Sequence, residues 1–291
     1  MNDQLEKERK QTRVLVLGGR GFIGRHAVKC LHERGAEVIV GTRSPSRADQ
    51  IEALLHRERD WPNKIESFDV VLNCVGILRQ RIGETYDQVH HLAPSALAQA
   101  CARKGVRFVH VSALGLSDSA KSRFITSKVK GERGIQAAGG DWAIARLSLL
   151  DGEGGYGAAW LRGVAKLPFF FSPTPAQGEI AALTADDAGC ALAALCLDER
   201  IDFARNRFFE LGGMATYTFE DYIRGLRKRY ADNAALALRV PGILARAFAH
   251  VCDLFHFSPF SFGHWELLCR DNVPMPNRLP ELLGKEPDKV I

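Results

Sequence analysis

The sequence lacks the long apolar run that a membrane-spanning helix needs. Although 46% of its 291 residues are hydrophobic, no uninterrupted apolar segment reaches about 20 residues, the length that crosses a bilayer. The nearest approach is "ILARAFAHVCDLFHF" at 243–257, which contains Arg246 and two histidines. We interpret this segment as a core helix, with a helix lying on a membrane surface as the alternative.

Clustered basic residues of the kind that bind nucleic acid are also missing. The net charge is +5, and the lysines and arginines are scattered along the chain. Only "RGLRKRY" at 224–230 gathers them, in a helical pattern typical of a solvated face. We therefore expect no nucleic-acid partner.

Cysteine and histidine pairs at metal-binding or redox spacing are absent as well. The seven cysteines contain no C-x-x-C pair and fall mostly in apolar stretches, and no signal peptide is visible. This pattern predicts buried free thiols in a reducing cytoplasm. The adjacent His90 and His91 would point about 100° apart on a helix, a poor arrangement for a metal ion. We expect no metal site.

What the sequence does contain is an alternation of short apolar strands with helical patterns. Such alternation predicts βαβ units and a parallel sheet buried on both faces, in an α/β, Rossmann-type doubly wound fold. The charged segment 44–67 stays open, because "IEALLH" fits either a helix or a strand. Strands are expected at 13–19, 36–43, 68–76, 106–115 and 142–150, and helices at 22–35, 85–104 and 123–138.

The domain organisation follows from where this alternation loosens, near residue 150. Residues 1–12 are polar and are expected to form a flexible tail. Residues 13–149 with about 179–213 would form a dinucleotide-binding domain. A smaller, discontinuous lobe for a substrate or partner would be built from 150–178 and 214–291.

A glycine-rich junction at 16–26, "VLGGRGFIGRH", is the strongest functional motif. Gly18, Gly21 and Gly24 are spaced G-x-x-G-x-x-G directly after a strand and directly before a helix. This context suits a sharp turn, close approach of the backbone to a pyrophosphate, and phosphate binding at the helix N-terminus, where Phe22 and Ile23 lie. A merely tight turn is the competing interpretation.

The end of the second strand indicates which nicotinamide cofactor would bind. An acidic residue there would bind the ribose hydroxyl of NAD, whereas a cation accommodates the 2′-phosphate of NADP. The sequence reads "GTRSPSR", with Arg43 and Arg47 and no acid before Asp49, and Arg20 adds a charge in the glycine loop. These residues favour NADP(H) over NAD(H), although exposed loop arginines would give the same pattern.

Four motifs together resemble the short-chain dehydrogenase/reductase superfamily, in its extended and atypical branch. They are "GGRGFIG", "NCVGIL" at 73–78, "VRFVHVSALG" at 106–115 and "SRFITSKVKGE" at 122–132. Over about residues 13–215 the chain looks most like the group that contains the nucleotide-binding accessory subunit of respiratory complex I. The resemblance implies that Cys74, Val75 and Gly76 lie beside the cofactor, that Ser112 orients a substrate, and that Lys128 binds the ribose.

One position departs from the superfamily pattern. Phe124 occupies the position of the superfamily's catalytic tyrosine, four residues before Lys128. None of the five tyrosines in the sequence has a lysine four residues later. General acid–base catalysis contributes about 10²–10⁴-fold, so the site would be impaired unless another group gives the proton. Ser112, Thr126, Ser127 and Tyr156 are the candidates for that role.

Other residues have two interpretations each. Arg79 and Arg81 follow a strand whose carboxyl end faces the expected crevice, so they would bind an anionic substrate or be exposed loop charges. "KLPFFFSP" at 166–173 would line a substrate pocket or fill the core, and Asp186 and Asp187 are explained as charges at a helix start.

Three functions are compatible with these observations. The first is an NADP(H)-binding protein with weak or no standard redox turnover, and the second is an NADPH-dependent reductase of a carbonyl or quinone-like substrate with a surrogate proton donor. An epimerase or isomerase is the third and weakest. The partners expected are a nicotinamide dinucleotide and an unknown small molecule, in the cytoplasm. A peripheral contact with a membrane, or with a respiratory, quinone-related partner, stays open.

Overall fold

The computed structural model describes residues 11–55, 58, 60–174, 178–203, 206–231, 233–255 and 258–291. Nearly all of the expected tail, residues 1–10, lies outside this range. In the described part, no helix combines the length and the apolar character that crossing a membrane requires.

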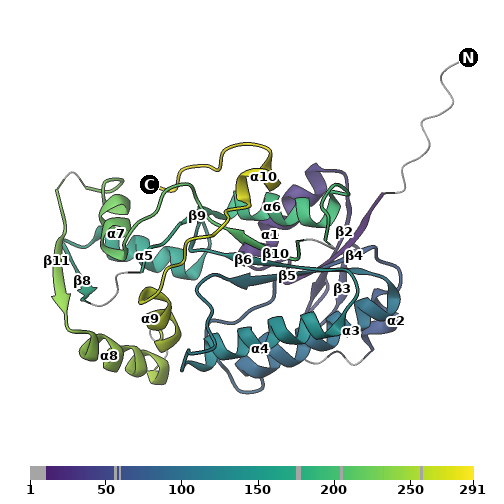
Figure 1. The fold of residues 1–291 in the computed structure, drawn as a ribbon, viewed down its shortest axis with the longest axis horizontal. Helices are drawn as coiled ribbons and strands as arrows, with labels where there is room; N and C mark the ends of the chain where they lie inside the picture. The colour runs from purple at the N-terminus through teal and green to yellow at the C-terminus, as the bar shows by residue number, and fades with distance from the viewer. Residues whose placement is uncertain are drawn as a thin grey trace, which may run out of the picture.

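Within the described residues, seven parallel strands form the central sheet (Figure 1), in the order β10-β6-β5-β4-β1-β2-β3. The chain winds outward from β1 in both directions, so the strand order reverses between β1 and β4. Ligands of open α/β sheets bind at the carboxyl ends of the strands at such a point. The strands are β1 (Arg13–Leu17), β2 (Glu37–Thr42), β3 (Gln50–Glu52), β4 (Val70–Asn73), β5 (Arg107–Ala113), β6 (Trp142–Leu147) and β10 (Phe208–Leu211).

Helices cover both faces of this sheet (Figure 1). Because alternate residues of a strand point to opposite faces, Val14 and Val16 of β1 share one apolar cluster, and Leu15 and Leu17 share the other. The first face carries α1 (Phe22–Glu33), α6 (Ala185–Leu197) and α10 (Leu279–Leu283). The second carries α2 (Trp61–Ile65), α3 (Ala93–Lys104) and α4 (Arg123–Ala138). The predicted Rossmann-type doubly wound sheet is confirmed.

Two segments that the sequence left ambiguous take defined structures. Segment 44–67 supplies both the short strand β3 and the short helix α2, while His56, Arg57 and Arg59 lie outside the described residues. The helix expected over 85–104 begins as a π-helical turn at η1 (Asp87–Leu92) and continues as α3. Pro94 does not break it, because Pro94 lies in the first turn of α3, where proline is tolerated.

The smaller lobe lies at the other end of the molecule (Figure 1). Phe170 is buried in its core, whereas Phe169 and Phe171 on either side are exposed, so "KLPFFFSP" is a strand that fills the core with every second ring. The lobe contains α5 (Tyr156–Lys166), β8 (Phe169–Pro173), α7 (Phe219–Arg227), β11 (Leu236–Val240), α8 (Gly242–Phe255) and α9 (Phe262–Leu268). The short pair β7 (Leu150–Asp151) and β9 (Leu183–Thr184) joins it to the sheet.

The cysteines correct one prediction. Cys30 of α1 and Cys190 of α6 form a disulfide, so the expectation that all seven thiols are free is wrong for this pair. The pair is separated by 160 residues and is brought together by the packing of α1 on α6, which sequence spacing does not indicate. Of the five free cysteines, Cys101, Cys196 and Cys252 are buried as expected, Cys74 is partly buried and Cys269 is exposed.

Candidate functional site

The glycine loop joins β1 to α1 at the carboxyl end of the sheet. Gly18 has a φ of +74°, a left-handed conformation that favours glycine, and its carbonyl oxygen accepts from the Gly21 N–H at 2.8 Å. A Cβ on Gly24 would lie closer than 3.0 Å to the backbone of Gly18 and Gly19, so only glycine lets α1 pack this closely on the loop. These glycines therefore serve the turn and the helix packing directly.

The N-terminus of α1 is open to an anion. Gly21 is the N-cap, no side chain caps the helix, and no acidic residue stands in its first turn. Phe22 packs against the turn at Gly152 and Gly155, and Ile23 is partly buried in the core cluster. The first N–H groups of a helix bind phosphate well because they have no partner within the helix. The loop thus fits the pyrophosphate of a dinucleotide.

Arginine side chains follow the end of β2, the part of this fold whose residues distinguish NADP from NAD. The Arg43 side chain is 73% exposed, and its guanidinium is 3.8 Å from the Glu84 carboxylate, a loose ion pair. Arg47 is bound more closely, to Asp49 at 3.1 Å, and Arg20 is exposed in the glycine loop. Of these three arginines, Arg43 has a largely exposed side chain and only a loose ion pair.

The end of β4 lies against the glycine loop. A Cβ on Gly18 would be 3.1 Å from the backbone of Cys74, so the two strand ends are in contact. Asn73 accepts from the Val75 N–H at 3.0 Å, which fixes the turn. Gly76 is exposed, and a Cβ placed on it would have His90 Nε2, at 3.9 Å, as its nearest neighbour. Burial raises the pKa of the Cys74 thiol, which keeps the thiol neutral.

Lys128 sits on α4 beside two buried histidines. Burial lowers the pKa of Lys128 to about 8, and Glu132, one turn later on the same helix, opposes this shift. The ammonium in turn helps to lower the pKa of both His90 and His110, although burial is the larger cause for each. Lys128 is therefore a partly buried cation that releases its proton more readily than an ordinary lysine.

The hydrogen bonds of His90 and His110 fix them as neutral rings. His90 Nε2 accepts from the Ile77 N–H at 3.1 Å, so its Nδ1 carries the proton toward Ser127 Oγ, also at 3.1 Å. His110 Nδ1 lies 3.0 Å from the Asn73 amide nitrogen, which donates to it. His90 thus positions the backbone after β4.

Ser112, at the end of β5, belongs to a buried ionic network. Its hydroxyl donates to Glu132 Oε1 at 2.6 Å, and Arg146 of β6 donates to both oxygens of the same carboxylate at 3.1 and 2.6 Å. A buried carboxylate needs such partners, and this one links β5, α4 and β6. The role of Ser112 toward a substrate stays a prediction, because its proton is engaged with Glu132.

Phe124 is enclosed by aromatic rings. Its ring centre lies 5.6 Å from those of Tyr86 and His90 and 5.4 Å from that of His264. A Cβ on Gly263 would lie 2.9 Å from the Phe124 Cβ, so α9 packs directly on this residue. The position where the superfamily places its tyrosine is thus an apolar cage covered by α9, and sequence reasoning did not predict that cover.

The three other hydroxyls considered as surrogate proton donors are engaged or remote. Thr126 donates to the Ser122 carbonyl at 3.0 Å, and Ser127 donates to the Phe124 carbonyl at 3.1 Å. Tyr156 is 59% exposed at the start of α5. The bonds of Thr126 and Ser127 hold the helix backbone, whereas the Lys128 ammonium lies 5.5 Å from the centre of the Phe124 ring.

Arg79 and Arg81 have different environments. Arg79 is largely buried; it pairs with Asp253 and donates to the carbonyl oxygens of Ser258 and Phe260, so the view of it as an exposed loop charge is wrong. It holds the connection between α8 and α9 against the loop after β4. Arg81 is exposed, and its backbone pairs with Glu84.

Metal ligands do not gather in the described part of the chain: no three side chains of His, Cys, Asp or Glu come together there in a way that would hold an ion. Asp186 and Asp187 lie in the first turn of α6, where they were expected. Asp186 pairs with His26 at 2.8 Å and Asp187 accepts from the Asp288 N–H at 2.7 Å.

Comparison with known proteins agrees with this geometry. Residues 14–133 match the NAD dependent epimerase/dehydratase family. Over these residues the chain is similar to the NAD-dependent, extended short-chain dehydrogenases/reductases. This match covers the glycine loop, the ends of β2 and β4, Ser112 and Lys128, and it supports the binding of a nicotinamide dinucleotide.

Similar proteins cover most of the length of this chain. A ceramide reductase of Caulobacter vibrioides is 26% identical over 289 residues, which cover 93% of this chain and 90% of the relative. An NADPH-dependent quinone oxidoreductase of Escherichia coli, solved with NADPH, has a TM-score of 0.72 at 15% identity and covers 95% of this chain and 96% of its own. MoeE5, solved with UDP-glucose and NAD, has a TM-score of 0.66 at 16% identity, covering 96% and 94%. At these identities the solved structures establish the fold.

Proposed function

We propose that this protein is an NADPH-dependent reductase of a carbonyl group on an apolar substrate. The full-length similarity to a protein named ceramide reductase supports a lipid-like substrate, and Arg43 at the end of β2 supports NADPH over NADH. The sequence alone placed this function second, behind a dinucleotide-binding protein without turnover. The environment of Lys128 is the observation that moves it forward.

The residues of the glycine loop fit the cofactor by their shape and charge. The uncapped N-terminus of α1 suits the pyrophosphate, and Gly76 presents no side chain at the end of β4. When bound, the reduced nicotinamide supplies a hydride to the carbonyl carbon. The protein must then bind both molecules and give one proton to the carbonyl oxygen, so that the product is an alcohol.

Lys128 has the properties that such a proton donor needs. An ordinary lysine, with a pKa of about 10.4, holds its proton too tightly for efficient transfer at neutral pH. Burial brings the pKa of Lys128 to about 8, which leaves the ammonium mostly protonated at pH 7 but able to release its proton. The amine formed by the transfer regains a proton from water. Lys128 would thus take over the part that tyrosine plays elsewhere in the superfamily.

A dinucleotide-binding protein without turnover is the second candidate. Its specific support is the apolar cage around Phe124 and the close packing of Gly263 of α9 on that ring. Such a cover would limit the access of a substrate to Lys128. The epimerase or isomerase alternative has only the family name in its favour, since these reactions normally use the tyrosine as well.

The deciding experiment combines binding and turnover. Calorimetry should give tighter binding of NADPH than of NADH, and a panel of long-chain ketones should support NADPH oxidation that weakens as pH rises through about 8. The Lys128→Met variant should lose about 10²–10⁴-fold in turnover, the usual contribution of a general acid. Lys130→Met, on the exposed side of the same helix, is the matched control and should keep full activity.

The outcomes separate the candidates. Binding of NADPH without turnover on any ketone would favour the non-catalytic protein. Turnover that is unaffected by Lys128→Met, or independent of pH near 8, would exclude Lys128 as the donor. Failure of both dinucleotides to bind would overturn the proposal as a whole.

A further inference from the structure

The surface of α8 is divided into three sectors. At about 100° per residue, Ala245, Ala249 and Cys252 fall on one side of the helix, and all three are buried against the lobe. A second sector carries Arg246, His250 and Asp253. The remaining arc is apolar and exposed, and we call it the α8 patch: Ile243, Leu244, Phe248, Val251, Leu254 and Phe255.

This exposure is unusual for residues of this kind. Leu254 is 74% exposed and Phe255 is 67% exposed, although the same helix buries three small residues instead. Scattered apolar residues on a surface need no explanation, but a continuous apolar face on one helix marks an interaction site. β8 and β11 lie at the same end of the molecule (Figure 1) and add the exposed side chains of Phe169, Phe171 and Leu236.

The charges beside the α8 patch are of one sign. Between Leu236 and Phe255 the only acidic residue is Asp253, which is partly exposed and whose charge is paired with Arg79; it also accepts from the Phe262 N–H at 2.9 Å. Arg239 and Arg246 are exposed. The surface presented to a partner is therefore apolar and cationic.

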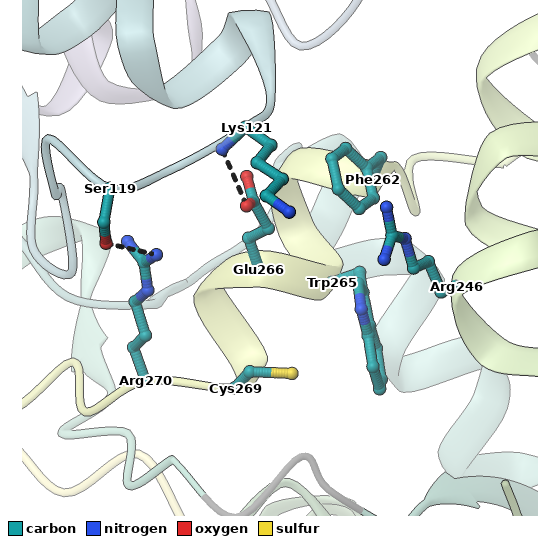
Figure 2. A pocket seen from close by; sticks show the side chains of 8 residues that line it. All are labelled: Ser119, Lys121, Arg246, Phe262, Trp265, Glu266, Cys269 and Arg270. Carbon is teal, nitrogen blue, oxygen red and sulfur yellow. Dashed lines mark hydrogen bonds between the residues drawn. The ribbon is translucent and has the colours of Figure 1, made fainter. Parts of the chain in front are cut away.

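A cavity of about 260 Å³ adjoins the sector of α8 that carries Arg246. Figure 2 shows the Arg246 side chain beside the Phe262 ring, with Lys121 and Arg270 on other walls of the cavity. The one carboxylate lining it, Glu266, accepts from two backbone N–H groups, of Lys121 and Ser122, at 2.8 Å each. The cavity thus offers three cationic side chains to a phosphate at the edge of the α8 patch.

We propose that α8 is a membrane-docking helix, which lies in the surface of an anionic bilayer with the α8 patch among the acyl chains. Its 14 residues are too few to span a bilayer and enough to lie in its surface. Arg239 and Arg246 then meet lipid phosphates. Charge selects this occupant over a second copy of the chain, because a symmetric dimer through this face would bring the same arginines together. The inference does not depend on the proposed reductase activity.

The test is the binding of the full-length protein to vesicles. Wild-type protein should sediment with vesicles of phosphatidylcholine and phosphatidylglycerol, bind vesicles of phosphatidylcholine alone less tightly, and lose the difference at high salt. The Arg239→Gln and Arg246→Gln variants should each weaken binding to the anionic vesicles by about fivefold, since one basic residue near such a surface contributes about 1 kcal/mol. The double variant Leu254→Glu, Phe255→Glu should abolish sedimentation.

Controls keep the outcome unambiguous. Leu92→Glu changes an exposed leucine on a different helix, 54% exposed, and should bind like wild type. Leu254→Trp should retain binding, and the fluorescence of the new tryptophan should shift to the blue at lower lipid concentration on the anionic vesicles than on phosphatidylcholine alone. If wild-type protein bound neither kind of vesicle, the proposal would be overturned. A wild-type dimer that the double variant converts to a monomer would also overturn it, because the patch would then be a contact between copies.

Discussion

The Lys128 ammonium lies 5.5 Å from the centre of the Phe124 ring, one helical turn away on α4. The cation of the superfamily's tyrosine–lysine pair is therefore retained beside a ring that has no hydroxyl. Phe124 differs from that tyrosine by one hydroxyl group, and the effect of adding this hydroxyl on turnover can be measured.

Replacing Phe124 by tyrosine should add a second acid beside Lys128. The new hydroxyl would stand near Lys128, whose charge would lower the pKa of the phenol, and turnover on ketones should rise, by less than the about 10²–10⁴-fold that a first general acid contributes. NADPH oxidation at saturating cofactor is the measurement. Phe124→Leu, which removes the ring without adding a hydroxyl, should give no increase. An equal rise in both variants would show that access past the ring, and not the proton, limits the reaction.

Gly24→Ala should weaken both the fold and cofactor binding. The added methyl group would meet the backbone of Gly18 and Gly19, and overpacking of this kind costs about 1–3 kcal/mol. Urea unfolding gives the stability, and titration with NADPH gives the affinity. Gly163→Ala is the matched control, because nothing lies within 4 Å of its Cβ position in α5 and the change should stabilise by about 0.4–1 kcal/mol. Equal stability of the two variants would contradict the close packing of α1.

Arg43→Ala should reduce the preference for NADPH. Loss of one charge-assisted contact to the 2′-phosphate should weaken NADPH binding by about tenfold and leave NADH unchanged. Calorimetry with both dinucleotides supplies the measurement and its internal control. A parallel loss for NADH would mean that Arg43 acts on the loop and not on the phosphate.

Stability should fall as the pH drops below about 6.5. Burial lowers the pKa of His110 to about 3 and of His264 to about 4, and it holds the pKa of His90 well below 6.5. These rings stay neutral in the folded protein, whereas an unfolded chain protonates them below pH 6.5. Unfolding then takes up as many as three protons, so the free energy of unfolding should fall by up to about 4 kcal/mol per pH unit.

Denaturant unfolding at pH 7, 6 and 5 measures this loss. His110→Gln keeps an acceptor for the Asn73 amide but removes one titrating ring, so its slope should be smaller by one proton. A wild-type stability that does not change between pH 7 and 5 would contradict the neutral state of these histidines.

Five thiols, and not seven, should react in the unfolded protein before reduction. The disulfide between Cys30 and Cys190 protects the other two, and mass spectrometry after alkylation counts the groups added. Adding a reductant first should raise the count to seven and, because the bond closes a long loop, lower the stability by about 2–4 kcal/mol. Seven additions without reductant would mean that the disulfide is not formed in solution.

The sequence predicted the elements that depend on local patterns. The apolar runs gave β1, β2, β4, β5 and β6, and the glycine spacing gave the loop before α1, because period and turn chemistry are encoded within a few residues. The burial of Arg79, the cover of α9 on Phe124 and the disulfide all join segments far apart in the chain. No local pattern reports such contacts, so sequence reasoning missed each of them.

Some features of the candidate site also follow from local motifs, whereas others depend on contacts between distant segments. The positions of Gly18, Arg43 and Lys128 at strand ends and on α4 follow from motifs, and they lie where the motifs indicate. The engagement of Ser112 with Glu132 could not be read from its motif, because it depends on Arg146 of the neighbouring strand.

The position of α10, the last helix of the described residues, limits which fragments of the chain could fold on their own. After passing through the smaller lobe, the chain returns to the main sheet, where Leu279 and Leu282 of α10 are buried beside α6 and the Asp288 N–H binds Asp187. The Rossmann core is thus completed by residues from the opposite end of the polypeptide. A fragment that ends before α10 would expose that core, and no single cut in the backbone would release either half of the molecule whole.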